Sequence, residues 1–515
     1  MRKKDGKKSS VVEMIGKRIP DPVIIFIILY VVTFLLSVFW GGLTFGESVV
    51  GGETIKYSIN NMAEAENVRW IFDNALLANW LAYGGGVLGL ILIVMFGVGI
   101  AEDSGLLATL IKKISMKCSD KWLPILLVFL GIMSSVASDA GYIILIPLAG
   151  LLYAGIKKNP LIGMAAAFAG VSAGFSANLI PATPIDVIVG SNAEIFAAAQ
   201  GVPFMSSRGT PLSVPYMNYY FIVVSTIVLS IVGAWVTIKI VAPKLEKQSF
   251  IIPDDLDLEE FTVKPEENIG LISAVVGLVF GIVIIVALYF GPLAPYADVN
   301  GKMITPFTNN IILMITIVFF MPGLFYGVAI KKYNNSQAIV MGLARQISNM
   351  GYVIVLTFFC YNFLALLTKS NIGTYITYLG ATFLENLGFG EWPMLLIIGF
   401  ILTTAVINLF VGGLSSKWLL LGPIFIPMLY RVHPEMTPDM VAAAFRVADS
   451  STNIITPMMS YTGVILAYMR KYKPEFTLGN LIGVMFPYSV VFLIVWTILL
   501  LIFFQLGLPL GPAGV

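Results

Sequence analysis

A group of polar side chains lies inside an apolar stretch towards the C-terminal end of the chain. The sequence FRVADSSTNIITPMM begins at Phe445 and carries Arg446, Asp449 and Asn453 at spacings that share one helix face. Pro457 cannot donate an N–H to the carbonyl oxygen of Asn453, so the helix should break there. Freed carbonyls can bind a cation and freed N–H groups an anion. We therefore predict a binding site here; alternatively, Arg446 and Asp449 form a charge pair that only stabilises the break.

Other polar groups interrupt apolar stretches elsewhere. Charged and carboxamide side chains are costly at bilayer depth, so they usually face a partner or a cavity. Those at such depth are Asp139, Asn178, Asp186, Asn408, Lys417, Arg446, Asp449 and Asn453. Because hard cations take oxygen ligands, we predict cation-coupling residues at Asp139, Asn178, Asn408, Asn453 and Thr456, with Na⁺ itself at Asn408, Asp449 and Asn453. The alternative coupling ion is a proton, carried by Asp139, Asp186 or Asp449.

The composition places these groups in a polytopic membrane protein. Of 515 residues, 58% are hydrophobic and only 12% are charged, whereas a soluble domain is about 25% charged. We therefore expect the lipid bilayer as environment and no nucleic-acid partner. The two cysteines and the single His433 suggest neither a disulfide nor a zinc site, and no cofactor is expected. Clear spans are predicted at 22–44, 81–101, 216–242, 270–292, 307–330, 343–368 and 480–507, the first being a retained span rather than a signal peptide.

Two further apolar regions do not read as simple spans. Residues 123–155 and 393–430 are broken in the middle by SSVASDAG and NLFVGGLSSKW, and each half is short for a crossing. If 123–155 crossed once, Lys121 and Lys157 would lie on opposite sides, against the positive-inside rule. Re-entrant hairpins at both regions give about nine spans plus two hairpins in the inner membrane, with the N-terminus cytoplasmic and the C-terminus outside.

The regions after the hairpins resemble each other. MAAAFAGVSAGFSANLIPATP from Met164 is similar to MVAAAFRVADSSTNIITPMMS from Met440. In the first copy, Pro181 and Pro184 free backbone carbonyls as Pro457 does in the second, and Gly170 and Gly174 let backbone approach a ligand. The first hairpin opens to the cytoplasm and the second to the outside. We therefore predict an all-α fold with an inverted repeat and two broken helices, which is typical of secondary transporters.

The motifs SDAGYIILIPLAG, AAAFAGVSAGFSANL, NLFVGGLSSKW and RVADSSTNIITPMM, in this order, resemble the p-aminobenzoyl-glutamate transporter (AbgT) family. The resemblance implies a homodimer of nine-span subunits that works as an elevator. It implies import of p-aminobenzoyl-glutamate, or export of sulfonamide antimetabolites, driven by an ion gradient. The family's substrate positions fall on Asp186, Ser415, Trp418, Pro438, Arg446 and Asp449. With such a substrate bound, Arg446 would bind one of its carboxylates and Trp418 would stack on its aromatic ring.

The resemblance also implies a division of the chain. Scaffold segments are expected at 1–122 and 216–392, with a cytoplasmic linker at 245–268, transport-domain segments at 123–215 and 393–475, and a C-terminal helix at 476–515. The expected function is a non-enzymatic, cation-coupled transporter of a small carboxylate. The alternatives are a transporter of dicarboxylates or short-chain fatty acids, a channel, and an intramembrane hydrolase that uses Asp139 with Asp186, or a serine beside Lys417.

Overall fold

The structure is a computed structural model. It describes residues 20–50, 53–75, 78–115, 122–137, 141–252, 263–297, 303–304, 306–349, 351–409, 413–456, 459 and 461–512. Asp139, Pro457 and part of the expected linker lie outside these residues. The described chain is helical apart from two small antiparallel sheets, which pair β1 (Thr44–Val50) with β2 (Glu53–Ser58) and β3 (Tyr296–Ala297) with β4 (Met303–Ile304).

Six described helices are long and apolar enough to cross a membrane. They are α2 (Pro22–Phe39), the continuous Tyr219–Leu245 made of α10 (Tyr219–Val236), η5 (Thr237–Val241) and α11 (Ala242–Leu245), α12 (Pro265–Phe290), α14 (Ile311–Ala329), α16 (Gly351–Lys369) and α22 (Leu478–Gln505). A seventh span results if α4 (Ala78–Ser104) and α5 (Leu106–Ser115) count as one, although they bend by 59° at Gly105. Each of the seven clear spans expected from the sequence overlaps one of these helices, with α4 included.

One of the expected boundaries is wrong. The span expected at 22–44 ends at Phe39, because the chain turns there and enters β1. The span expected at 343–368 takes in the end of α15 (Ser336–Asn349) and most of α16, on either side of residue 350, which lies outside the described residues. Shorter elements complete the described fold: α3 (Ala65–Trp70), η1 (Ile71–Ala75), α13 (Pro306–Asn309), α17 (Ile372–Asn386) and η7 (Phe389–Glu391).

The regions expected to form hairpins contain short helices. In the first region they are α6 (Leu123–Met133), η2 (Ser134–Ala137), η3 (Gly141–Leu145) and α7 (Ile146–Gly155), and in the second α18 (Pro393–Asn408) and α19 (Leu414–Val432). The 11 residues of α6 and the 16 of α18 extend about 17 and 24 Å, less than the roughly 30 Å of a hydrocarbon core. Of the first polar interruption, residues 134–137 form η2, and of the second, residues 414–418 form the start of α19.

The repeated regions form broken helices with matching starts. The first contains α8 (Pro160–Phe168), η4 (Ala169–Ala173) and, after an irregular segment, α9 (Pro184–Ala199). The second contains α20 (Pro438–Asn453) and, after its break, α21 (Thr462–Tyr472). Pro438 follows Pro160 by 278 residues, and Thr462 follows Pro184 by the same 278. The constant offset shows that the break and both flanking helices repeat as one unit.

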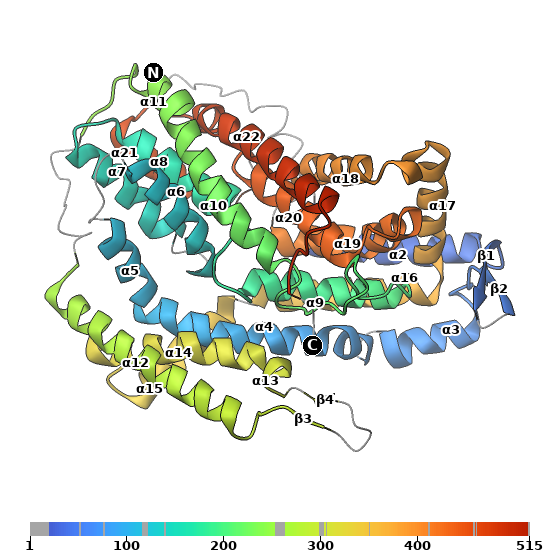
Figure 1. The fold of residues 1–515 in the computed structure, drawn as a ribbon. Helices are drawn as coiled ribbons and strands as arrows, with labels where there is room; N and C mark the ends of the chain where they lie inside the picture. The colour runs from blue at the N-terminus through green and yellow to red at the C-terminus, as the bar shows by residue number, and fades with distance from the viewer. Residues whose placement is uncertain are drawn as a thin grey trace, which may run out of the picture.

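Helices α4, α12 and α14 run side by side in one layer (Figure 1). The repeated helices lie together with α10 and α22 across α4 from α12 and α14 (Figure 1). A large apolar core fills the part that contains the hairpin regions and the broken helices. A smaller apolar cluster joins the two parts, where Val94 and Val98 of α4 meet Val136 of η2 and Val187 of α9. The broken helices are thus separated from α12 and α14 by α4.

Glycines bring the first hairpin region directly onto the first broken helix. A Cβ at Gly170 would lie 2.2 Å from the carbonyl oxygen of Val128 on α6, and one at Gly174 would lie 2.4 Å from Ile132. The sequence analysis assigned these glycines to close approach by a ligand. In the structure Gly170 instead admits the backbone of α6 and Gly174 the side chain of Ile132, so their small size serves helix packing.

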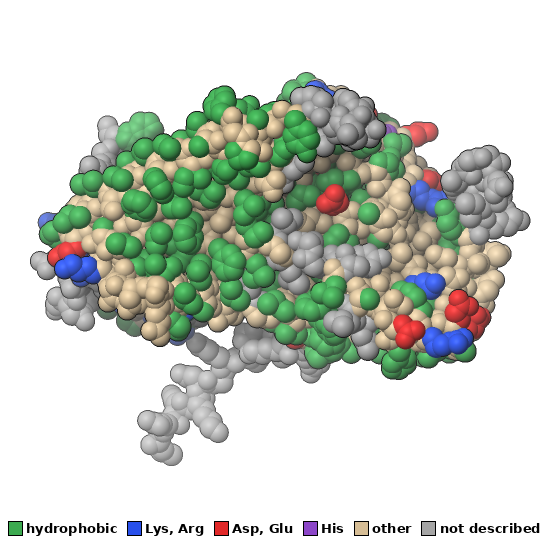
Figure 2. Space-filling view, turned by 90° about the horizontal axis from the view of Figure 1, so that it is seen from below, with side chains coloured by type: hydrophobic (Ala, Val, Ile, Leu, Met, Phe, Trp, Pro, Cys, Tyr) green, Lys and Arg blue, Asp and Glu red, His purple; other side chains and the backbone are tan. Residues whose placement is uncertain are grey.

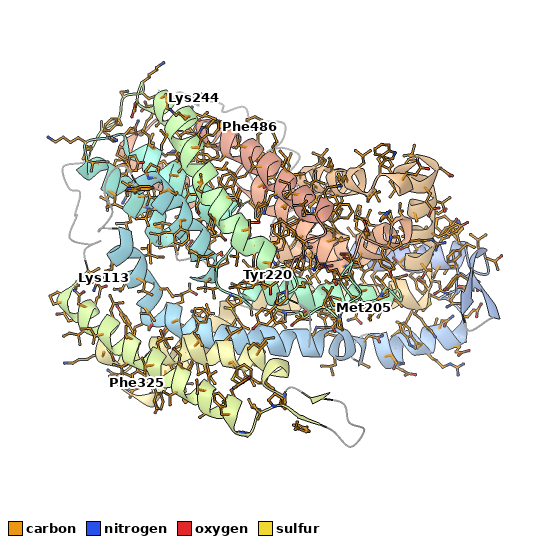
Figure 3. The ribbon with its side chains drawn as sticks, in the orientation of Figure 1. Lys113, Met205, Tyr220, Lys244, Phe325 and Phe486 are labelled. Carbon is orange, nitrogen blue, oxygen red and sulfur yellow. The ribbon has the colours of Figure 1, made fainter. Side chains whose placement is uncertain are left out.

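The surface fits a lipid environment. Figure 2 shows hydrophobic side chains spread over much of the face seen from below. On α12, Ile272, Val275 and Val279 are all exposed. Lys113 and Lys244 lie towards the same end of the molecule, and Met205 lies away from that end (Figure 3).

Candidate substrate and cation site

The two broken helices contact each other where their regular hydrogen bonding ends. Ser176 lies in the first break, and its N–H donates to the Ser450 hydroxyl of α20 at 3.1 Å. The carbonyl oxygen of Ser176 accepts a hydrogen bond from Arg446 Nη2 at 3.2 Å. The Ser172 hydroxyl lies 3.6 Å from Met459 Sδ in the second break. Side chains of the second repeat thus satisfy backbone groups that the first break exposes.

Arg446 forms a buried ion pair with Asp186, in the first turn of α9. Nη2 of Arg446 contacts Oδ1 of Asp186, and the two side chains are 3% and 4% exposed. The other carboxylate oxygen accepts from the N–H and the hydroxyl of Thr183, at 2.9 and 2.8 Å. Thr183 caps α9 in return, so the carboxylate belongs to a capping box. Asp186 is thereby oriented by its own helix as well as by the guanidinium.

Asp449 forms a second buried ion pair, with Lys417 of α19. Lys417 Nζ lies 2.5 Å from Asp449 Oδ1, and both side chains are fully buried. The ammonium also donates to Oδ1 of Asn408 and, at 3.3 Å, to Oδ1 of Asn453. We call Asn408, Lys417, Asp449 and Asn453 the lysine cluster.

Asn408, at the end of α18, ties the lysine cluster to α20. Its amide nitrogen donates to the carbonyl oxygen of Asp449 at 2.6 Å and to the Thr452 hydroxyl at 2.7 Å. It also lies 3.2 Å from Oδ1 of Asn453. The three residues predicted to bind Na⁺ therefore do meet, but the ammonium of Lys417 lies among their oxygens.

The alternative in which Arg446 and Asp449 pair with each other is wrong. Both residues are on α20, but each pairs with a residue from another helix. A local pair would leave Asp186 and Lys417 as two separated buried charges, each at a cost of several kcal/mol. The observed pairing neutralises all four charges, which explains why it is preferred.

The remaining substrate positions are spread along these helices. Trp418 is fully buried, its indole N–H donates to the Val189 carbonyl oxygen at 3.0 Å, and its ring packs between Phe196 and Phe445. Pro438 starts α20, about 12 Å along the helix from Arg446. Ser415 is half-buried in the first turn of α19. The structure thus brings Asp186 and Arg446 together, with Asp449 one helical turn away, and leaves Pro438 apart.

The remaining residues predicted to couple a cation contact the two hairpin regions. The Asn178 amide donates to the Ser135 hydroxyl of the first hairpin region at 2.9 Å. The Thr456 hydroxyl donates to the carbonyl oxygen of Leu409 at 3.3 Å. Asp139 is not among the described residues. Each described residue thus links a break to the hairpin region that precedes it in the sequence.

The sequence analysis missed the role of Lys417. It counted Lys417 among the costly charges at bilayer depth but gave it neither a partner nor a function. The role of Lys417 could have been inferred from the charges. Two buried carboxylates, of Asp186 and Asp449, need two positive partners, and Arg446 can neutralise only one of them. Among the residues that the structure describes, no three His, Cys, Asp or Glu side chains come together as a metal site.

Residues 8–515 match the sequence model of the AbgT putative transporter family. The chain belongs to this family. A p-aminobenzoyl-glutamate transport protein of Escherichia coli (strain K12) is 30% identical over 516 residues, which cover 98% of this chain and 96% of that protein. These comparisons confirm the resemblance drawn from the motifs.

Two solved structures are similar to this AbgT-family chain. The YdaH transporter of Alcanivorax borkumensis has a TM-score of 0.84 and 30% identity, covering 96% of this chain and 100% of that one. MtrF of Neisseria gonorrhoeae, described within a class of antimetabolite efflux pumps, has a TM-score of 0.83 and 34% identity, covering 98% and 99%. Because the AbgT family consists of transporters, the chain is a multi-pass membrane transporter and not an enzyme. This excludes the hydrolase alternative.

The buried pair of Arg446 with Asp186 should stabilise the fold only while both partners are present. Arg446→Ala leaves a buried carboxylate without its counter-charge, so we expect a loss of about 3–5 kcal/mol in stability. The double variant Arg446→Ala/Asp186→Ala should regain part of this loss. The measurement is thermal unfolding of the purified protein in detergent.

The matched control is Arg345→Ala. Arg345 also pairs with an aspartate, Asp103, but its side chain is 52% exposed, so the loss should stay near 0–1 kcal/mol. Equal destabilisation by Arg446→Ala and Arg345→Ala would contradict the assignment.

Proposed function

We propose that this chain is a cation-coupled secondary transporter of p-aminobenzoyl-glutamate or a related aromatic carboxylate. Na⁺ or H⁺ is the coupling ion, and the chain lies in the inner membrane with its N-terminus cytoplasmic and its C-terminus outside. The Escherichia coli relative named above supports this substrate. The alternative direction and cargo is export of sulfonamide antimetabolites, and the similarity to MtrF supports the export of antimetabolites.

The observation that carries the proposal is an unused donor on Arg446. Its Nε is buried and has no hydrogen-bond partner among the described residues, and the same holds for the Ser176 hydroxyl beside it. A buried donor without a partner costs about 1–3 kcal/mol. A substrate carboxylate satisfies such a donor with a charge-assisted hydrogen bond. Arg446 can therefore hold Asp186 through Nη2 while Nε receives a glutamyl carboxylate.

The transport movement is also part of the proposal. Residues 123–155 and 393–430 form re-entrant hairpins, so the chain has nine spans with the broken helices included. The hairpins and broken helices slide as one transport domain against the scaffold, elevator-fashion, in a homodimer. In support, the contact of α4 with η2 and α9 is apolar, through Val94, Met95 and Val98. An apolar contact of this kind lets α4 slide over η2 and α9, while the hydrogen bond from Tyr361 of α16 to Asn192 of α9 has to break during the movement.

Transport of p-aminobenzoyl-glutamate should depend on the guanidinium of Arg446. Arg446→Lys keeps the charge but loses the planar fork of donors. We expect the half-saturation concentration for uptake into proteoliposomes to rise about 10-fold or more, since a hydrogen bond to a charged group contributes roughly 1.5–3 kcal/mol. Radiolabelled p-aminobenzoyl-glutamate provides the readout. Unlabelled dicarboxylates and short-chain fatty acids should compete poorly.

Arg345→Lys serves as the control, because Arg345 lies on α15 and contacts Asp103 rather than the site. It should transport as the wild type does. A well-folded Arg446→Lys variant with wild-type half-saturation would refute the substrate role. Strong competition by a dicarboxylate or a short-chain fatty acid would favour the alternative transporter.

The re-entrant first hairpin predicts that Lys113 and Lys157 lie on the same side of the membrane. Each is replaced by cysteine in a background without the two native cysteines, and oriented vesicles are treated with a membrane-impermeant thiol reagent. Both positions should label from the cytoplasmic side, whereas Arg431→Cys should label from the outside. Labelling of positions 113 and 157 from opposite sides would show that 123–155 crosses the membrane once.

A further inference from the structure

Lys417 lies where the sequence predicts a sodium ion. Its ammonium nitrogen is 2.5 Å from Asp449 Oδ1 and 3.3 Å from Asn453 Oδ1, and it also donates to Asn408 Oδ1. These are the three side chains predicted as Na⁺ ligands. Lys417 reaches them from the first turn of α19, next to Gly413, whose φ of 77° suits glycine.

The number of partners matches an ammonium group. A lysine ammonium has three N–H donors and no acceptor. Here the side-chain oxygens of Asn408 and Asn453 accept hydrogen bonds from it, and Asp449 Oδ1 forms an ion pair with it at 2.5 Å. Because the Lys417 side chain is fully buried, donors without partners would be costly. The three oxygens therefore fit the tethered cation already present.

The charge at the lysine cluster leaves no place for a second cation. Lys417 and Asp449 neutralise each other, and the nearby carboxylate of Asp186 is neutralised by Arg446. Among the described side chains, no further anion contacts the cluster. Adding Na⁺ would bury an uncompensated positive charge, which costs several kcal/mol. The described residues of this site therefore do not fit a sodium ion.

We propose that the Lys417 ammonium takes the place of Na⁺ in the lysine cluster, so that this position works without a sodium ion. The inference refines the proposed function, because it concerns the coupling ion of the same transporter. An ammonium fixed to α19 cannot be exchanged with the solution on either side. The lysine cluster therefore holds the second hairpin on α20 without carrying Na⁺ across the membrane, and any Na⁺ coupling has to act elsewhere.

Sodium binding by the full-length chain tests this proposal without requiring transport. Thermal unfolding of purified protein in detergent is followed while NaCl replaces choline chloride at constant ionic strength. Any sodium-specific shift in the melting temperature of the wild type should be unchanged by Asn408→Ala, because the proposal places no Na⁺ in the lysine cluster. Lys417→Met removes the ammonium and leaves the three oxygens with the charge of Asp449. This variant should gain a saturable stabilisation by Na⁺, since a ligand that binds only the folded state raises its stability.

Two variants make the result specific. Lys417→Met/Asn408→Ala removes one oxygen ligand and should lose the gained response. Lys113→Met removes a lysine that contacts Asn268 far from the lysine cluster and should behave as the wild type. A folded Lys417→Met variant without a sodium response would overturn the proposal. A saturable sodium response of the wild type that Asn408→Ala abolishes would also overturn the proposal. If Lys417→Met fails to fold, this comparison of the wild type with Asn408→Ala is the test.

Transport assays separate this inference from the proposed function. If the wild type binds no Na⁺ in the lysine cluster but fails to transport p-aminobenzoyl-glutamate, the proposed substrate is wrong and the inference stands. If it transports p-aminobenzoyl-glutamate and also binds Na⁺ in the lysine cluster, the inference is wrong and the proposed substrate stands.

Discussion

Four charged side chains, two of each sign, are buried where the repeated helices meet, and each needs a counter-charge. Arg446 and Asp449 come from α20, while Asp186 comes from α9 and Lys417 from α19. A buried charge without a partner costs several kcal/mol, so the helices can pack only in an arrangement that forms both pairs. This requirement holds the second hairpin region and the first broken helix on α20 at the same time.

The two ion pairs give α9, α19 and α20 the character of one rigid unit. Hydrogen bonds of Asn408 to α20 and of Ser176 to Ser450 strengthen the same contacts. The contact of this unit with α4 has a different nature, because it is formed by apolar side chains. The apolar contact with α4 suits the proposed sliding movement, whereas buried hydrogen bonds from Tyr361 of α16 to Asn192 and from Asn218 to the carbonyl oxygen of Asp439 would have to break during it. The unused donor of Arg446 lies inside the unit, so a bound substrate would move with it.

Patterns that depend on neighbouring residues could be predicted from the sequence. Apolar runs gave seven helices at the expected places, and prolines with small residues gave the breaks at 174–183 and after Asn453. Tertiary partners could not be predicted in this way. Arg446 and Asp449 share a helix face, so a local pair looked sufficient, whereas Arg446 pairs with a residue 260 positions away. The lysine beside Trp418 was noticed as a costly charge, but nothing in its local sequence shows that it would reach Asp449. The same holds for Gly170. The sequence shows that something approaches this residue closely, but it does not show that the approaching element is α6.

The central claim is that Arg446 pairs with Asp186 while Lys417, rather than Na⁺, pairs with Asp449. An experimental structure of the full-length protein in lipid, determined in sodium-containing buffer at a resolution that shows side chains and ions, tests it most directly. We expect density for the Lys417 side chain to reach Asp449, and density for Arg446 to reach Asp186. A separate ion density between Asn408 and Asp449, with Lys417 turned away, or a direct contact of Arg446 with Asp449, would contradict this account.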